Sequence, residues 1–252
     1  MNSNIRLALM LGYQDLRQAY RRSAIGPFWL TLGMAVQIAS MGFVFGLIFK
    51  NEITEYLPFL AVSIIVWNFM TTTINEGCFA FIASEGIIKQ IALPFSTFVV
   101  RVVWRNLLIA GHNAVIIPLV LLIFLLTPSW SLIALVPGAA LLVANLGWIV
   151  WITAFISSRY RDTPQIISSV LTVAFFVTPI MWNPELMEDN ALTHLFLGLN
   201  PFYHLLQIVR LPILGSWPTL ENWGLAILSA LAGSILVFLI DKKYKNRIAF
   251  WV

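Results

Sequence analysis

Charged residues are scarce in this sequence. Fifteen lysines and arginines and eleven aspartates and glutamates make up 10% of the 252 residues, whereas a soluble domain carries about 25%. Every residue from Asn106 to Ser158 is uncharged. With 60% hydrophobic residues and a mean hydropathy of +0.87, the chain cannot cover a water-facing surface. This composition excludes a soluble enzyme, a secreted disulfide scaffold and a disordered tail, and it predicts an integral membrane protein.

Residues that carry catalytic or metal chemistry are also few. The single cysteine, Cys78, excludes an intramolecular disulfide, and three scattered histidines cannot form a zinc site. None of the five lysines lies in a phosphate-binding G-x-x-x-x-G-K-[ST] motif, so the chain is not expected to hydrolyse ATP itself. One carboxylate, Glu76, lies at the end of an apolar segment and none lies inside one. This disfavours a carrier driven by protons or sodium.

Six apolar segments are long enough to cross a bilayer, which takes about 20 residues. The long uncharged stretch supplies two of them because it breaks at the turn residues 127–131. A seventh candidate, 190–209, is interrupted by histidine, glycine and an Asn-Pro pair. The expected transmembrane segments are residues 28–49, 57–76, 101–126, 132–155, 163–183 and 222–240.

The basic residues determine the expected orientation. With six spans and a cytoplasmic N-terminus, thirteen of the fifteen basic residues face the cytoplasm, and Lys50 and Arg210 lie outside. A seventh span would move four C-terminal cations to the far side, against the positive-inside bias. We therefore expect an all-α membrane protein with both ends inside, a cytoplasmic segment at 1–27 and a cytoplasmic tail at 241–252. The net charge of +4 belongs to these loops and does not indicate nucleic-acid binding.

Two of the cytoplasmic segments have helical patterns. Residues 5–22 predict an amphipathic helix that lies along the inner membrane surface. Its apolar stripe consists of Ile5, Leu9, Tyr13, Leu16 and Tyr20. Residues 84–93 predict a short helix with Ser84 as its N-cap and a Glu85–Lys89 pair at i,i+4.

The expected external segment, 184–220, contains two helix starts. Asn-Pro pairs at 183–184 and 200–201 each place a capping asparagine before a proline at the first helical position. Arg210 follows near the end of the second helix, where a cation complements the helix dipole. Two short apolar helices between two spans predict a re-entrant hairpin. Such a hairpin is tolerated at bilayer depth where protein or a water-filled cavity surrounds it, which indicates a pore or a gate.

Aromatic residues make up 13% of the chain and allow two interpretations. Most are explained by interfacial belts and core packing. Some can instead be stacking platforms for sugar rings in a conduit. Phe175, Phe176 and Trp182 are the best candidates, because they lie in or beside the fifth span, next to the expected hairpin.

Four stretches of the sequence point to one family when they are taken together. They are DLRQAYRRSAIGPFW at 15–29, SSRYRDTPQIISSVLTVAFFVTPIMW at 157–182, NPFYHLLQIVRLPILG at 200–215 and the terminal NRIAFWV. In this order they resemble the membrane subunit of ABC exporters for polysaccharides of the O-antigen, capsule and teichoic-acid type. With six spans, the resemblance covers essentially the whole chain. Thr163 departs from the family pattern, in which an apolar residue follows R-Y-R-D.

The resemblance implies half of a transporter in the bacterial inner membrane. Two copies would form the channel as a homodimer, and two separate ATPase subunits, which hold ATP and Mg²⁺, would bind beneath it. The implied substrate is a polysaccharide on an undecaprenyl-type diphosphate lipid, for which O-antigen is the first expectation. Membrane lipids are the other expected partners.

The resemblance also implies roles for particular residues. Segments 84–93 and 157–164 are expected to dock the ATPase through Glu85, Lys89, Arg159, Arg161 and Asp162. Arg17, Arg21 and Arg22 are candidates for holding the lipid diphosphate, because cations near the inner interface suit a dianionic headgroup. Anchoring of the topology is the alternative explanation for both sets of charges. Residues 184–211 are expected to gate the outer exit, with Asn200, Pro201 and Arg210 as its functional positions.

Two other classes of function compete with this interpretation. The nearer one is ABC export of another lipid or of a small molecule. The more distant one is a lipid scramblase or membrane enzyme that needs no ATPase. An enzyme would be expected to show polar or acidic residues clustered at one membrane face, and the sequence has no such cluster.

Overall fold

The computed structural model describes residues 3–21, 23, 25–26, 28–49, 52–184 and 191–252. Throughout these ranges the secondary structure is helical and contains no strand. The helices are α1 (Ser3–Ala19), α2 (Phe28–Phe49), α3 (Ile53–Gly77), η1 (Ile82–Ser84), α4 (Glu85–Gln90), α5 (Ser96–Asn113), α6 (Ile116–Ile123), η2 (Trp130–Ala134), α7 (Leu135–Arg159), α8 (Thr163–Val177), α9 (Ala191–Gly198), α10 (Pro201–Ile213) and α11 (Leu220–Trp251).

Five helical stretches are long and apolar enough to cross a membrane. They are Phe28–Ile48, Ile53–Gly77, Ser96–Ile123, Trp130–Arg159 and Leu220–Lys245. Each of them overlaps one of the six segments that the sequence predicts as spans. The chain is therefore an all-α, multi-pass membrane protein.

The predicted fifth span, 163–183, forms a shorter helix than expected. Helix α8 has 15 residues and ends at Val177. Thr178 then adopts extended backbone angles, φ −88° and ψ 135°. Because Thr178 precedes Pro179, it is driven out of the helical region by the proline ring, and residues 178–183 continue without regular helix.

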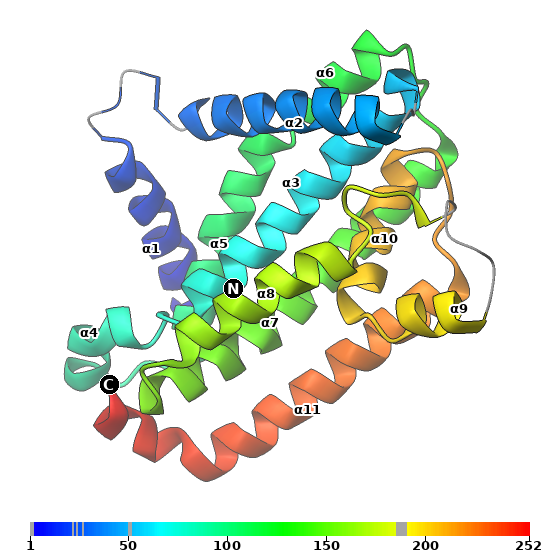
Figure 1. Cartoon of the computed structure of the whole chain (residues 1–252). Helices are drawn as coiled ribbons and strands as arrows, with labels where there is room; N and C mark the ends of the chain where they lie inside the picture. Colours follow the sequence, from blue (N-terminus) through cyan, green and yellow to red (C-terminus); the bar gives the residue numbers. More distant parts are fainter. Residues whose placement is uncertain (1–2, 22, 24, 27, 50–51, 185–190) are drawn as a thin grey trace.

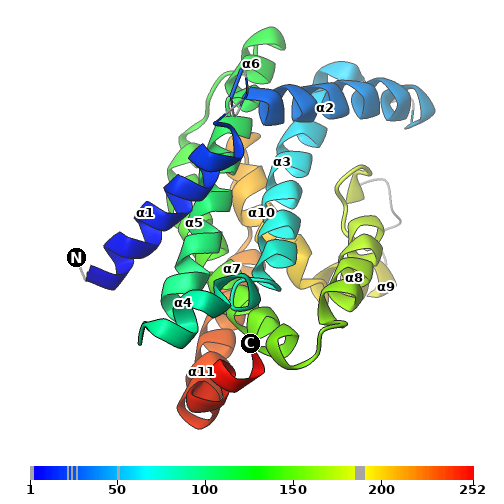
Figure 2. The same ribbon diagram turned by 90° about the vertical axis from the view of Figure 1, so that its left-hand side faces the viewer.

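Helix α3 forms the centre of the molecule. It contacts α2, α5, α7 and α10, and Figures 1 and 2 show it surrounded by these helices in both views. Fifteen of its 25 residues are buried. The main core lies around it and includes Leu60, Met70, Leu146, Ile180 and Leu206. The segment after α8 is part of this core, because Ile180 is fully buried.

Helix α1 packs along α5 through small side chains. Ala8, Gly12 and Leu16 are its buried residues. A Cβ atom on Gly12 would lie 2.8 Å from the carbonyl oxygen of Arg101, so glycine permits the close approach. The predicted apolar stripe is therefore only partly correct. Ile5 and Tyr13 are exposed, because α5 selects the small-residue face.

The segment 241–252 is not a separate tail. Helix α11 continues through it to Trp251. Ile248 and Val252 are buried in a second core together with Phe81 and Phe98. In Figure 1 this end of α11 lies beside α4 and the turn between α7 and α8.

Candidate functional site

Helix α4, the α7–α8 turn and the C-terminal end of α11 lie at one end of the molecule (Figure 1), and charged residues on them are exposed. We call this surface the charged end. Its residues are Glu85, Lys89, Arg159, Arg161 and Asp162, and all five are exposed. The sequence-predicted docking residues are therefore brought together on one surface.

The i,i+4 ion pair predicted for α4 is present. Lys89 Nζ lies 2.6 Å from Glu85 Oε1, and the two side chains are 48% and 50% exposed. The hydrogen bond and charge of Lys89, with a smaller contribution from Arg161, hold the pKa of the Glu85 carboxyl below its usual value. Arg161 therefore acts on α4 across the gap between the two segments. Ser84 occupies the predicted N-cap position but makes no side-chain capping bond.

The aromatic C-terminus packs on the basic turn. The guanidinium of Arg159 lies 5.1 Å from the centre of the Trp251 ring, within cation–π range. Arg161 Nη2 donates a hydrogen bond to the carbonyl oxygen of Trp251 at 3.3 Å. Trp251 also contacts Phe155, with ring centres 5.5 Å apart. The R-Y-R-D turn and the end of α11 thus form one unit.

Two ion pairs tie the ends of α1, α3 and α5 together. Arg101 on α5 forms a two-pronged pair with Asp15 on α1, at 2.6 and 2.7 Å. One turn further along, Arg105 Nη2 lies 2.5 Å from Glu76 Oε2 on α3. Asn106 donates to the same carboxylate oxygen. Neither pair was predicted from the sequence. The signal that could have indicated them is that the paired residues have opposite charges and lie at the same expected depth in the membrane.

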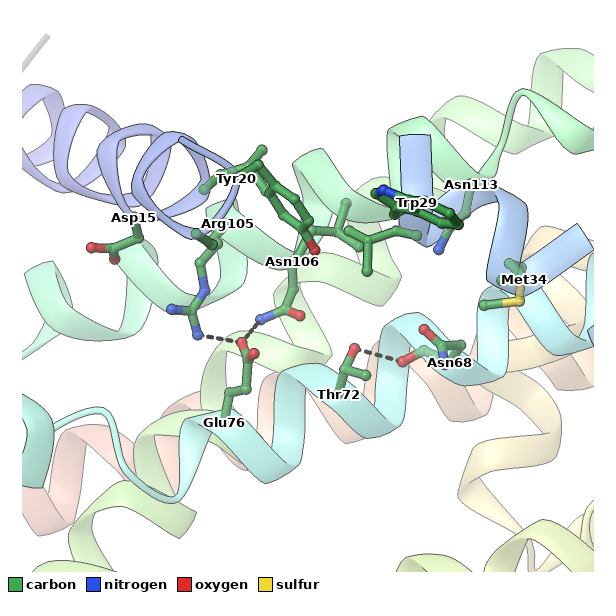
Figure 3. A pocket seen from close by; sticks show the side chains of 15 residues that line it. Asp15, Tyr20, Trp29, Met34, Asn68, Thr72, Glu76, Arg105, Asn106 and Asn113 are labelled. Atoms are coloured by element: carbon green, nitrogen blue, oxygen red, sulfur yellow. Dashed lines mark hydrogen bonds and ion pairs between the residues drawn. The ribbon is translucent and has the colours of Figure 1, made fainter. Parts of the chain in front are cut away.

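These helices enclose a cavity of about 470 Å³. Figure 3 shows Glu76 beside Arg105 and Asn106, Thr72 and Asn68 further along α3, and Asn113 beside Trp29. The cavity lies between α1, α2, α3 and α5, and the sequence analysis did not predict it. Its place in the fold separates it from the arginines expected to hold a diphosphate.

Two of the arginines expected to hold the diphosphate, Arg17 and Arg21, are described by the structure. Arg17 and Arg21 are exposed, and neither lines the cavity. Arg22 falls outside the described residues. Arg17 and Arg21 are therefore free to face lipid headgroups or a partner.

The three candidate aromatics near the fifth span have different surroundings. Phe175 packs inward, with its ring centre 6.0 Å from that of Trp67. Phe176 is 63% exposed on the surface of α8. Trp182 is half-buried and donates its indole N–H to the carbonyl oxygen of Phe176 at 3.3 Å. Of the three, Phe176 has the free surface that a stacking platform needs.

Helix α8 is exposed on most of its circumference. Among its residues, Thr163 and Leu171 are buried. The exposed apolar residues are Ile166, Val170, Val173 and Phe176. Beside them lies an exposed polar stripe formed by Gln165, Ser168, Ser169 and Thr172.

Asn200 is the N-cap of α10, as the sequence predicts. Asn200 Oδ1 accepts hydrogen bonds from the backbone N–H groups of Phe202 and Tyr203, at 3.0 and 3.3 Å. Pro201 occupies the first turn. The amide of Asn200 also donates to Thr178 Oγ1 at 2.9 Å, so the cap of α10 is joined to the end of α8. The start predicted at 183–184 is followed by residues 185–190, which lie outside the described ranges.

Arg210 is buried, with 1% of its surface exposed. Nη1 donates to Pro179 O at 2.7 Å and to Ser63 Oγ at 3.0 Å. Nε and Nη2 donate to Gln207 Oε1, and the guanidinium lies 4.4 Å from the centre of the Phe59 ring. Arg210 lies in the last turn of α10, where the sequence predicts a cation that complements the helix dipole. Its hydrogen bonds join α10 to α3 and to the segment after α8.

Comparison with known families decides the class of protein. Residues 7–214, which run from α1 through the end of α10, match the family described as ABC-2 type transporter. The chain belongs to the ABC-2 type transporter family. This confirms the resemblance to the membrane subunit of an ABC exporter, which is a transporter component and not an enzyme. A short second match, to the IPTL-CTERM motif, covers residues 218–239 within α11.

Curated relatives of this ABC-2 chain carry one description. The O-antigen export system permease protein RfbA of Myxococcus xanthus is 25% identical over 203 residues, covering 79% of this chain and 77% of the relative. The protein of the same name from Klebsiella pneumoniae is 24% identical over 190 residues, covering 73% and 71%. Membership in this transporter family implies an ATPase partner.

Proposed function

We propose that this chain is the channel-forming permease subunit of an ABC transporter that exports lipid-linked O-antigen across the bacterial inner membrane. The names of its relatives support the substrate, and the ABC-2 family supports the transporter class. ATP and Mg²⁺ are held by a separate ATPase subunit. This chain carries no nucleotide-binding motif of its own.

The single observation that carries the proposal is the charged end. The five charged residues are exposed on α4 and at the α7–α8 turn, two elements that lie at the same end of the molecule (Figure 1). The Trp251 contacts hold the basic turn against the end of α11. An organised, exposed, mixed-charge surface suits the docking of a soluble ATPase. Charges that serve only to anchor topology need no such common platform.

The topology follows from placing the charged end in the cytoplasm. Five long helices then cross the membrane, and the sixth crossing consists of α8 with the residues after it. At 1.5 Å per residue α8 extends about 22 Å, less than the roughly 30 Å hydrocarbon core. The remaining depth is crossed by residues 178–183. Their carbonyl groups find protein partners in Arg210 and Tyr56, which meets the requirement for irregular backbone inside a bilayer.

The exposed face of α8 supports a homodimer with a central path. A stripe of Gln165, Ser168, Ser169 and Thr172 is poorly suited to lipid tails. It suits a second copy of the chain or a water-filled channel. Phe176 on the neighbouring face offers an aromatic surface to a passing sugar ring.

The outer hairpin supplies the gate, and the inner arginines supply the first contact with the substrate. Asn200 and Arg210 connect α10 to the end of α8, so movement of the hairpin and of the channel-lining helix is linked. Arg17 and Arg21 are exposed on α1, where they are placed to bind the diphosphate of the carrier lipid.

Gene deletion with complementation tests the function. In an O-antigen-producing host that lacks its own permease, this chain and its cognate ATPase are expected to restore O-antigen at the cell surface. A Walker-lysine variant of the ATPase should leave the polymer inside. Restoration by this chain without any ATPase would support a scramblase instead. Normal O-antigen in a strain lacking the chain would favour export of another substrate.

A further inference from the structure

A groove of about 790 Å³ lies between the connector from α4 to α5, helix α7 and the second half of α11. Its walls are mostly apolar and include Ile91, Phe95, Trp151 and Val237. Ile91 and Phe238, which also line it, are 55% and 67% exposed, so the groove is open on one side. An open apolar groove beside a membrane-spanning helix is suited to a hydrocarbon chain from the bilayer.

The groove runs from bilayer depth to the cytoplasmic surface. Along α11 its lining residues are, in chain order, Ser234, Val237, Phe238, Asp241 and Lys245. The membrane-spanning stretch of α11 ends at Lys245, and Ser234 lies about 16 Å deeper at the helical rise per residue. With the cytoplasmic placement of the charged end proposed above, the apolar part of the groove lies in the inner leaflet. Asp241 and Lys245 then lie at the level of the lipid headgroups, which we call the mouth of the groove.

Two lysines at the mouth are free to bind an anion. Lys245 lines the groove, and Lys242 lies one turn beyond Phe238 on the same side of α11. Both are exposed, and among the described residues neither forms an ion pair. The neighbouring cations differ, because Lys243 and Arg247 lie over the ring of Tyr244, 5.3 and 5.8 Å from its centre. Unpaired lysines beside a spanning helix attract anionic headgroups.

Asp241 narrows the class of anion. Its carboxylate lines the groove one helical turn, about 6 Å, from Lys245. A headgroup that carries a hydroxyl beside its phosphate suits both residues, because the phosphate contacts Lys245 while the hydroxyl donates to Asp241. The two lysines and Asp241 leave one net positive charge, which a zwitterionic headgroup would not balance. The other polar side chains of the groove, Ser96 and Ser234, are uncharged.

The groove lies apart from the proposed export path. None of its described lining residues belongs to α8, whose polar stripe we place at the channel. It is also separate from α1, which carries the arginines proposed to bind the carrier diphosphate. A lipid in this groove would therefore remain bound while the substrate passes, and it is a component of the transporter instead of its cargo.

We propose that this groove binds an anionic phospholipid of the phosphatidylglycerol class. One acyl chain lies along the apolar walls, the phosphate contacts Lys245 and Lys242, and the glycerol hydroxyls donate to Asp241. Ile88 of α4 also lines the groove, so the lipid supports from the membrane side the helix that carries Glu85 and Lys89.

Native mass spectrometry tests the headgroup contacts. The intact transporter, with its ATPase, is released from nanodiscs that contain equal amounts of phosphatidylglycerol, phosphatidylethanolamine and phosphatidic acid. The wild type is expected to retain phosphatidylglycerol in preference to the other two. Lys242→Gln together with Lys245→Gln should reduce this retention about tenfold. Lys243→Gln removes the same charge from the same helix and should retain the lipid nearly as the wild type does.

Two further variants test the acyl chain and the hydroxyl contact. Ser234→Trp fills the apolar part of the groove at an exposed position and should reduce retention of every phospholipid. Leu228→Trp, at an exposed position of α11 outside the groove, is its matched control. Asp241→Asn should raise retention of phosphatidic acid relative to phosphatidylglycerol. A thermal melt of each variant shows that a loss of lipid is not a loss of fold.

Four results would overturn the proposal. Equal retention of the three phospholipids, or wild-type retention by the double lysine variant, would remove the headgroup contacts. Retention by the permease alone that disappears when the ATPase binds would assign the groove to the ATPase. Displacement of the bound lipid by an undecaprenyl-diphosphate saccharide would make the groove a substrate site. None of these measurements involves transport, so they can fail while the proposed export function holds, and the reverse.

Discussion

Arg210 on α10 donates a hydrogen bond from Nη1 to the carbonyl oxygen of Pro179 at 2.7 Å. Pro179 lies just beyond the end of α8, where the last carbonyl groups of a helix lack internal partners. A cation at this position also complements the negative end of the α8 dipole. One buried side chain thereby stabilises the irregular segment and joins it to α10.

Replacement of Arg210 by methionine is expected to loosen this junction. The change leaves Pro179 O and Gln207 Oε1 buried without a donor, at a cost of about 1–3 kcal/mol for each. Thermal unfolding in detergent should show a clear fall in Tm. Arg210→Lys should recover part of the loss, since an ammonium can reach Pro179 O but cannot contact all three acceptors. Arg6→Met, at an exposed arginine, is the control; equal Tm values for Arg210→Met and Arg6→Met would contradict the role.

The two functions of Asn200 can be separated by mutation. Asn200→Ala removes both the cap of α10 and the bond to Thr178, whereas Thr178→Val removes the bond alone. Loss of an asparagine cap costs about 1 kcal/mol, so Asn200→Ala should lower the Tm more than Thr178→Val. Limited proteolysis should cut near the start of α10 faster in the alanine variant. An equal effect of the two substitutions would mean that the cap contributes little.

Charge reversal at the basic turn is expected to weaken ATPase binding. Arg159→Glu together with Arg161→Glu reverses two exposed cations and removes the contacts with Trp251. Co-purification of the ATPase should fall several-fold, with export falling in parallel. Arg6→Glu alters an exposed cation outside the charged end and should bind normally. Unchanged assembly and export in the double variant would remove the docking role.

Cross-linking tests the position of α8 in the dimer. The natural cysteine, Cys78, is buried and is replaced by alanine to give a clean background. A cysteine at Ser168 on the exposed polar stripe should form a cross-linked dimer with a short bis-maleimide in membranes. Leu228→Cys, which is exposed on α11, should remain monomeric because the proposed dimer leaves that surface to lipid. Dimers from Leu228→Cys but not from Ser168→Cys would place the interface elsewhere.

The sequence predicts the helices better than it predicts their contacts. Runs of apolar residues mark α2 and α3 because burial in lipid requires them, and the Asn200 cap follows from local backbone chemistry alone. The early end of α8 has a local signal too, because Thr178 precedes Pro179. The prediction of a full-length span at 163–183 did not take this signal into account.

The contacts between helices depend on how each helix is rotated about its axis and how far it is shifted along its neighbours. No local sequence pattern determines either quantity. The Asp15–Arg101 pair joins positions 86 residues apart. It forms because Gly12 lets α1 approach α5 closely. The burial of Arg210 likewise requires Ser63 from α3 and Pro179 from the segment after α8. The sequence predicts this arginine near the end of the correct helix, but it carries no signal for these partners.

The central claim is that this chain forms the membrane path for ATP-driven export of a lipid-linked polysaccharide. The most direct measurement is transfer of undecaprenyl-diphosphate-linked O-antigen across proteoliposomes that contain the purified chain and its ATPase. The account predicts transfer that requires both subunits and hydrolysable ATP. Transfer that proceeds at the same rate without ATP, or with this chain alone, would contradict it.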